Sequence, residues 1–135
     1  VGSDQAAEFN RLPVGKPGSH AAALAQLTMM SGKTIVFHTG LSVYHSGKAC
    51  DETVVVRTEV EFRVNPAARI ERYLRLEPAF DCAGSFKSES LGAALCHRIS
   101  SDDPTALIGL PLLALVRLLE KFGVELPCTS PDLGQ

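Results

Sequence analysis

Two long segments in the first half of the chain carry β-branched and aromatic residues at strand spacing. They are residues 34–44 and 53–64, and a polar stretch around Gly47 separates them. Between Thr58 and Val64 the apolar or small positions alternate with charged ones, which is the period of a sheet with one face in water. We therefore predict two long antiparallel strands.

Three other segments carry the start and stop signals of helices. Each begins at a capping or first-turn residue and ends at a glycine or where the apolar pattern stops. The predicted helices are 19–31, 65–75 and 111–121. In the first, the expected apolar face consists of Ala22, Leu24, Ala25, Leu27, Thr28 and Met29. The apolar stretch 106–119 is too short to cross a bilayer, and we interpret it as a buried helix.

The chain start and the segment 82–104 are predicted to form turns, loops and short strands. Val1 to Ser3 resembles a strand end, because a β-branched residue precedes two small ones. Asp4 would then follow the strand, where open sheets gather their ligands, although a turn Asp with only a local hydrogen bond is an alternative. A Gly/Ser-rich segment, 82–92, leads into a predicted strand at 93–99, and a turn is predicted at 102–104.

Together these elements predict an α/β fold with a mixed, largely antiparallel twisted sheet flanked by helices. With 135 residues, 45% of them hydrophobic and 21% charged, the chain fits one domain with a stable core. We expect the domain to cover residues 1–126 and the tail, 127–135, to be flexible because it has few apolar side chains.

Charge and cysteine usage narrow the class of protein. The formal net charge is −2 and the basic residues are scattered, so no nucleic-acid partner is expected. No stretch predicts a membrane partner. The four cysteines form no C-x-x-C pair, which favours reduced thiols, and with no visible signal peptide a cytoplasmic location is the default.

Two loops have side chains suited to a polar ligand. In 15–18, small and rigid residues flank Lys16, so a phosphate could approach its ammonium and the backbone N–H groups; an exposed loop lysine is the alternative. Segment 82–92 combines Lys87 and Glu89 with three hydroxyls, as a solvated surface loop also could, although Phe86 favours packing. The four histidines are dispersed and are not expected to be ligands. The residues alone thus indicate a phosphate-compatible small-molecule site.

Several of these segments, in this order, resemble the Maf family of nucleotide pyrophosphatases. The matching motifs are Gly2-Ser3-Asp4-Gln5, Gly15-Lys16-Pro17, Ser31-Gly32 with Thr39-Gly40, and Phe62-Arg63. The segment Cys82 to Glu89, and Asp103-Pro104 with Leu107 to Pro111, resemble the branch that acts on 7-methyl-GTP. The resemblance implies a Maf/inosine triphosphatase-like fold. The family's opening strand and helix have no counterpart before Val1, so an N-terminally truncated member is expected.

The resemblance also implies roles for individual residues. The family cuts a nucleoside triphosphate between its α- and β-phosphates with a divalent metal cation, Mg or Mn. Asp4 would be the catalytic proton acceptor and metal-associated carboxylate, and Lys16 would neutralise phosphate charge. Gln5 and Glu89 match the positions that determine substrate specificity, and Lys87 would bind a phosphate or hold Glu89. The resemblance is compatible with a homodimer.

Three alternatives stay open from the sequence. The substrate could be dTTP or UTP within the same family. The protein could instead be a non-catalytic nucleotide-binding regulator of septum formation, an association that also comes from the resemblance. A generic globular domain with purely structural motifs is the third.

Overall fold

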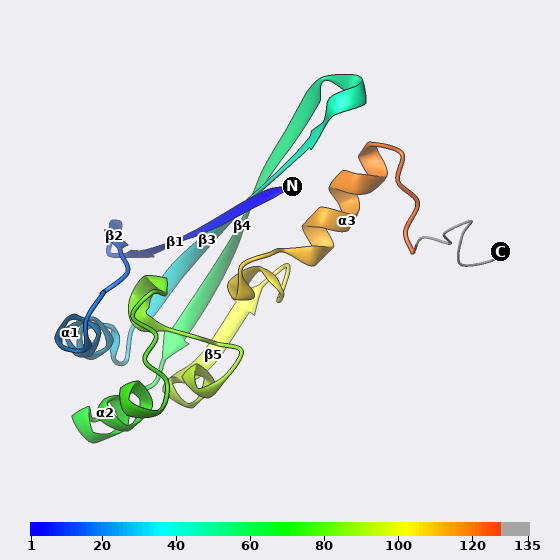
Figure 1. The fold of residues 1–135 in the computed structure, drawn as a ribbon. Coiled ribbons are helices and arrows are strands. Elements are labelled where there is room, and N and C mark those ends of the chain that lie inside the picture. The colour runs from blue at the N-terminus through cyan, green and yellow to red at the C-terminus, as the bar shows by residue number, and fades with distance from the viewer. Residues whose placement is uncertain (128–135) are drawn as a thin grey trace.

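The computed structural model describes residues 1–127 as a five-stranded antiparallel sheet whose helices all lie on one face (Figure 1). The strand order is β2-β1-β3-β4-β5. The strands are β1 (Gly2–Phe9), β2 (Leu12–Val14), β3 (Thr34–His45), β4 (Cys50–Phe62) and β5 (Cys96–Ser101). The helices are α1 (His20–Met30), α2 (Ala67–Leu76) and α3 (Leu112–Lys121). The predicted α/β class is confirmed, and every strand pair within residues 1–127 is antiparallel.

The long β3–β4 hairpin is the predicted one, and its alternation sets the two faces of the sheet. Directly paired residues point to the same face, so Phe37 and Thr58 both face the helices. His38 and Arg57, one position along, face the opposite side, which no described helix covers. Val64 was expected on the apolar face, but β4 ends at Phe62 and Val64 is exposed.

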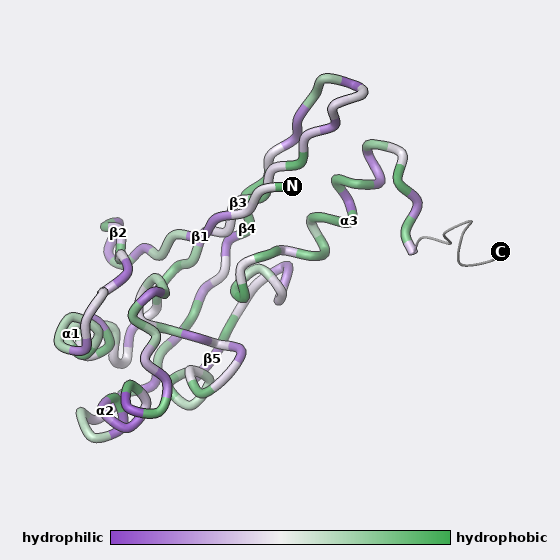
Figure 2. Tube along the Cα trace, in the orientation of Figure 1, coloured by the Kyte–Doolittle hydropathy of each residue, from purple (hydrophilic) through white to green (hydrophobic). Residues whose placement is uncertain are grey.

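Two apolar clusters lie along the helix-covered face. The larger packs α1 and α2 on the sheet through Leu27, Ile70 and Phe37. The smaller packs α3 against the far end of the hairpin. The interpretation of 106–119 as a buried helix is wrong, because α3 buries only Ala114 and Leu118 within its bounds. Hydrophobic residues recur along the whole helix (Figure 2), and among them Leu112 and Leu113 are nearly half exposed.

The predicted strand end at Val1–Ser3 is also wrong. β1 continues to Phe9, and the turn comes at Asn10 and Arg11, which both have positive φ. Gly2 to Glu8 pair with β3, and these backbone hydrogen bonds outweigh the local turn preference of small and polar residues. Asp4 therefore lies within a strand, opposite Gly40, rather than in a loop.

The helix signals were correct in position but not always in detail. Ser19 caps α1 by accepting a hydrogen bond from Ala22 N at 3.2 Å, as predicted. The buried side chains of α1 are Ala23, Leu27 and Met30, so its packed face differs from the predicted one. Pro66, rather than the expected Asn65, occupies the cap position of α2.

The remaining segments shift by a few residues. Asn65 donates its side-chain amide to the carbonyls of Arg63 and Leu95, and its Oδ1 accepts from Arg69 Nη1, so neither end of this side chain caps the backbone of α2. The predicted strand 93–99 begins later, at Cys96, because Leu91–Leu95 form a 3₁₀ turn. The expected flexible tail lies outside the described residues, apart from Pro127.

Candidate functional site

The two loops with phosphate-compatible side chains lie against each other. The carbonyl of Gly15 accepts hydrogen bonds from Gly84 N at 3.4 Å and from Gln26 Nε2 at 2.9 Å. The other end of the Gln26 amide accepts from Ser85 Oγ at 2.9 Å. Gln26 on α1 thus bridges the Lys16 loop and the 82–92 loop. Gln26 was not among the residues predicted from the sequence, where its only signal is a polar side chain beside the buried positions of α1.

The 82–92 loop is packed rather than free in solvent. Phe86 is buried against Phe62, with ring centroids 5.2 Å apart. The hydroxyl of Tyr73 donates to Ser85 O and accepts from Lys87 N, both at 3.1 Å. Burial raises the pKa of Tyr73 well above its ordinary value, so its hydroxyl remains a neutral donor. The loop therefore has a fixed inner side.

The outer side of this loop carries the charged groups. Lys87 is half-buried, while Glu89 is exposed, as is Lys16 on the neighbouring loop. Within residues 1–127, neither the two ammonium groups nor the Glu89 carboxylate takes part in a hydrogen bond or ion pair. These three predicted site residues are consequently available to a ligand.

β1 places the other two predicted site residues on opposite faces of the sheet. Gln5 pairs with the buried Thr39 and points to the helix-covered face, whereas Asp4 pairs with Gly40 and points to the open face. The Asp4 carboxylate accepts the backbone N–H of Gln5 at 2.8 Å. Since β2 pairs only with Ala7–Phe9, the first half of β1 forms an outer edge of the described sheet.

A polar row on β1 and β3 holds the turn that precedes α3. Gln5 Nε2 lies 3.1 Å from each of three acceptors, namely Thr39 Oγ1 and the carbonyls of Ala106 and Leu107. Thr39 Oγ1 also donates to Ala106 O at 3.0 Å. Ser3 Oγ lies 2.5 Å from Gly109 O and 3.0 Å from Gly40 O, and its one proton can go to either carbonyl. No role was predicted for Ser3 or Thr39, because their partners lie far away in the chain.

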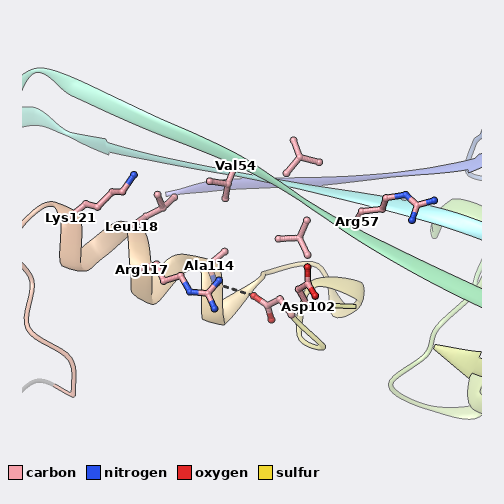
Figure 3. Close-up of a pocket in the computed structure, with 10 residues that line it drawn as sticks. Val54, Arg57, Asp102, Ala114, Arg117, Leu118 and Lys121 are labelled. Atoms are coloured by element: carbon pink, nitrogen blue, oxygen red, sulfur yellow. Dashed lines mark hydrogen bonds between the residues drawn. The ribbon is translucent and has the colours of Figure 1, made fainter. Parts of the chain in front are cut away.

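A separate pocket of about 440 Å³ lies between β4 and α3 (Figure 3). Apolar side chains, including Val54, Ala114 and Leu118, line it. The pocket is also bordered by three basic residues, Arg57, Arg117 and Lys121, and by two acidic residues, Asp102 and Asp103. Basic side chains therefore slightly outnumber acidic ones around it. None of the predicted site residues lines this pocket, so it is distinct from the predicted site.

Other chemistry has little support in the described part of the chain. No group of three or more His, Cys, Asp or Glu side chains there is arranged to hold a metal ion, so Asp4 is a lone carboxylate. Cys50, Cys82 and Cys96 are free thiols, as expected, and burial raises the pKa of Cys96 to about 12; Cys128 lies outside the described residues. None of the described helices is both long and apolar enough to span a membrane.

The fold and the paired loops define an α/β domain with a polar, phosphate-compatible surface beside an edge strand. Comparison with known proteins identifies the family. A family model described as "Maf-like protein" matches residues 1–122. The chain therefore belongs to the Maf-like family, which confirms the resemblance drawn from its motifs.

Relatives in this family bear a more specific name. A protein of Xanthomonas oryzae pv. oryzae strain MAFF 311018, named 7-methyl-GTP pyrophosphatase, is 53% identical over 127 residues, which are 94% of this chain and 66% of that protein. Proteins of the same name from Burkholderia pseudomallei strain 1710b and Paraburkholderia xenovorans are 49% and 51% identical over 93% of this chain, covering 59% and 62% of their own lengths. The chain thus spans slightly under two thirds of the length of these relatives.

Proposed function

We propose that the protein is a nucleoside triphosphate pyrophosphatase that hydrolyses 7-methyl-GTP to 7-methyl-GMP and pyrophosphate. The observation that carries this proposal is the 53% identity, over 94% of the chain, to a relative named for that activity. We further propose that it acts in the cytoplasm on the free nucleotide pool.

The paired loops support this proposal through their charge. Lys16 and Lys87 supply two ammonium groups that have no partner within residues 1–127, on loops that hydrogen-bond to each other, which suits a polyphosphate. Glu89 presents a carboxylate that is unpaired in the described part of the chain and can accept the adjacent N1–H and N2–H donors of guanine. Methylation at N7 makes the base cationic, so the same carboxylate would favour it further.

Asp4 is the proposed group that accepts a proton from the attacking water. Its carboxylate is exposed, and one of its oxygens receives a hydrogen bond from Gln5 N. A single carboxylate fits a magnesium ion that takes its remaining oxygens from substrate phosphates and water. Such an ion, when bound, would neutralise phosphate charge. Asp4 would hold it and orient the water.

The proposed site spans the outer edge of β1. Asp4 points to the open face, while the loop bearing Lys87 and Glu89 lies with α1 and α2 on the helix side. The Ala83–Ser85 turn of that loop packs against β1, so the proposed site would draw residues from both sides of this strand. A triphosphate reaching across this edge could contact residues from both faces.

The direct test is pyrophosphate release by the purified chain with Mg²⁺ or Mn²⁺. The proposal expects hydrolysis of 7-methyl-GTP, and a loss of about 100-fold or more in Asp4→Asn and Lys16→Ala. Arg117→Ala, which alters the separate pocket, is the control and should behave like the unmodified chain. Binding of 7-methyl-GTP without turnover would instead support a non-catalytic regulator.

The substrate is tested by Glu89→Gln, compared on 7-methyl-GTP, GTP, dTTP and UTP. Replacing a charged acceptor of two N–H donors should lower the preference for 7-methyl-GTP by about 10- to 100-fold. An unchanged preference would remove Glu89 from base recognition. If the unmodified chain hydrolyses dTTP or UTP faster than 7-methyl-GTP, the preferred substrate is one of those nucleotides instead.

A further inference from the structure

We propose that Gln5 is a positioning residue that fixes the turn Ala106–Gly109, and that it influences nucleotide discrimination through this turn rather than by contacting the base. The second half of this inference rests on the proposed function. The first half concerns the folded chain alone and can be tested without any nucleotide.

The hydrogen bonds of Gln5 leave its donors no capacity for a ligand. Carbonyl oxygens only accept, so the two carbonyls beside Nε2 fix which end of the carboxamide is the NH₂ group. Two N–H groups face three acceptors, the Ala106 and Leu107 carbonyls and Thr39 Oγ1, each at 3.1 Å. A base could use these donors only by displacing the turn from the sheet.

Two neighbouring side chains hold the same turn. Thr39 is fully buried, and its hydroxyl donates to Ala106 O while it accepts from Gln5. Ser3 lies on the same face of β1, two residues before Gln5, and its hydroxyl can donate to Gly109 O of the turn or to Gly40 O of β3. Three side chains of one sheet face therefore lie within hydrogen-bond distance of three carbonyls of a single turn.

The residues on either side of this turn are also tied to each other, by hydrogen bonds that do not involve β1. Thr105 Oγ1 accepts Leu112 N at 2.7 Å, and Asp103 Oδ2 accepts Ala114 N at 3.0 Å. Between these anchors Ile108 is exposed and Gly109 has a φ of +126°, a conformation that few residues other than glycine adopt. The turn thus has one defined position, which depends on Gln5 on the side of β1.

Amide hydrogen exchange of the nucleotide-free chain tests the positioning role. In Gln5→Met the side chain keeps its length but loses both donors, and exchange at Ile108 and Gly109 should be at least about tenfold faster. Gln26→Met is the matched control, because it removes a carboxamide whose donor goes to Gly15. It should leave these two amides unchanged. Unchanged exchange in Gln5→Met would overturn the proposal.

Dissociation constants for 7-methyl-GTP and GTP then test the effect on discrimination. If Gln5 acts through the turn, Thr39→Val and Ser3→Ala should change the ratio of the two constants in the same direction as Gln5→Met. A change confined to Gln5→Met would show direct base contact and overturn the second half. If the unmodified chain binds neither nucleotide, the proposed function fails, and so does the proposed effect of Gln5 on nucleotide discrimination. The exchange experiment still decides whether Gln5 positions the turn. Should Gln5→Met not fold, the exchange comparison passes to Ser3→Ala, on the exposed part of β1.

Discussion

Asp103 is a nearly fully buried carboxylate that organises the start of α3. Its side chain is 2% exposed and accepts hydrogen bonds from Thr105 N, Thr105 Oγ1 and Ala114 N. Burial alone raises the pKa of this carboxyl, but the hydrogen bonds from Thr105, Ala114 and Leu113 outweigh it and hold the pKa below the ordinary value of 3.8. The helix N-terminus favours the same negative charge.

The lowered pKa predicts a pH dependence of stability. A carboxyl with a depressed folded-state pKa contributes its full stabilisation above its unfolded-state pKa and loses it as the pH falls through the folded-state value. The free energy of unfolding should therefore decline below about pH 3.8, partly through Asp103. Asp103→Asn should lower the free energy of unfolding by about 1–3 kcal/mol at pH 7 and weaken its dependence on acid pH. Urea unfolding of both proteins at pH 7, 4 and 3 would show this. If the free energy of unfolding fell with pH by the same amount in both proteins, Asp103 would not be a source of the acid dependence.

Gly92 is a second residue whose identity follows from its surroundings. A Cβ atom added there would lie 2.2 Å from Lys87 O and 2.8 Å from a ring carbon of Phe86. We expect Gly92→Ala to lower the free energy of unfolding by about 1–3 kcal/mol, because backbone and a packed ring would have to move. Thermal unfolding measures this. Gly2→Ala, where no atom lies within 4 Å, is the matched control and should have a much smaller effect.

Single residues also show where prediction from the sequence ended. Asp4 and Gln5 are neighbours in a matching motif, and the sequence suggested one shared loop. Because they lie in a strand, alternation sends their side chains to opposite faces. The contact of Gln26 with both polar loops could not be foreseen, because it depends on where α1 packs.

At the scale of elements, α1 depends on its first residue. Ser19 Oγ accepts Ala22 N at 3.2 Å, and the first turn contains no acidic residue to assist the helix dipole. Ser19→Ala should therefore cost about 1 kcal/mol, and Ser19→Asn, which keeps an acceptor, should cost little. Chemical denaturation of the three proteins measures the difference. Equal losses in both variants would show that the hydroxyl does not act as a cap.

The long hairpin and the three helices were predictable because strong local signals specify them. Strand alternation from Thr58 to Phe62 and the cap at Ser19 agree with tertiary packing, so local and global preferences coincide. Only the start of β1 was recognised as strand, since Gly-Ser-Asp-Gln has weak strand propensity and its continuation to Phe9 is held by pairing with β3. The face of α1 was misassigned for a similar reason, as its residues are apolar on several sides.

At the scale of the whole molecule, the sheet has one covered and one open face. The open face carries polar pairs, such as the hydrogen bond between His38 and Glu8 and the ion pair between Arg57 and Glu59. The first pair is partly exposed and the second is exposed, so each adds little to stability. The folding free energy must come mainly from the helix-covered face, where apolar residues form two clusters rather than one.

This division predicts that the two ends of the sheet open separately. Leu118 is buried in the smaller cluster with Leu41, Val43 and Phe122, and Leu27 belongs to the larger one. A Leu→Ala change in a core costs about 2–5 kcal/mol. In Leu118→Ala that loss should appear as faster amide exchange in α3 and the outer half of the hairpin, with α1 and α2 still protected. Leu27→Ala should instead raise exchange in α1, α2 and the end of the sheet that they cover, with α3 still protected. Uniform acceleration in both variants would mean that the two clusters unfold as one unit.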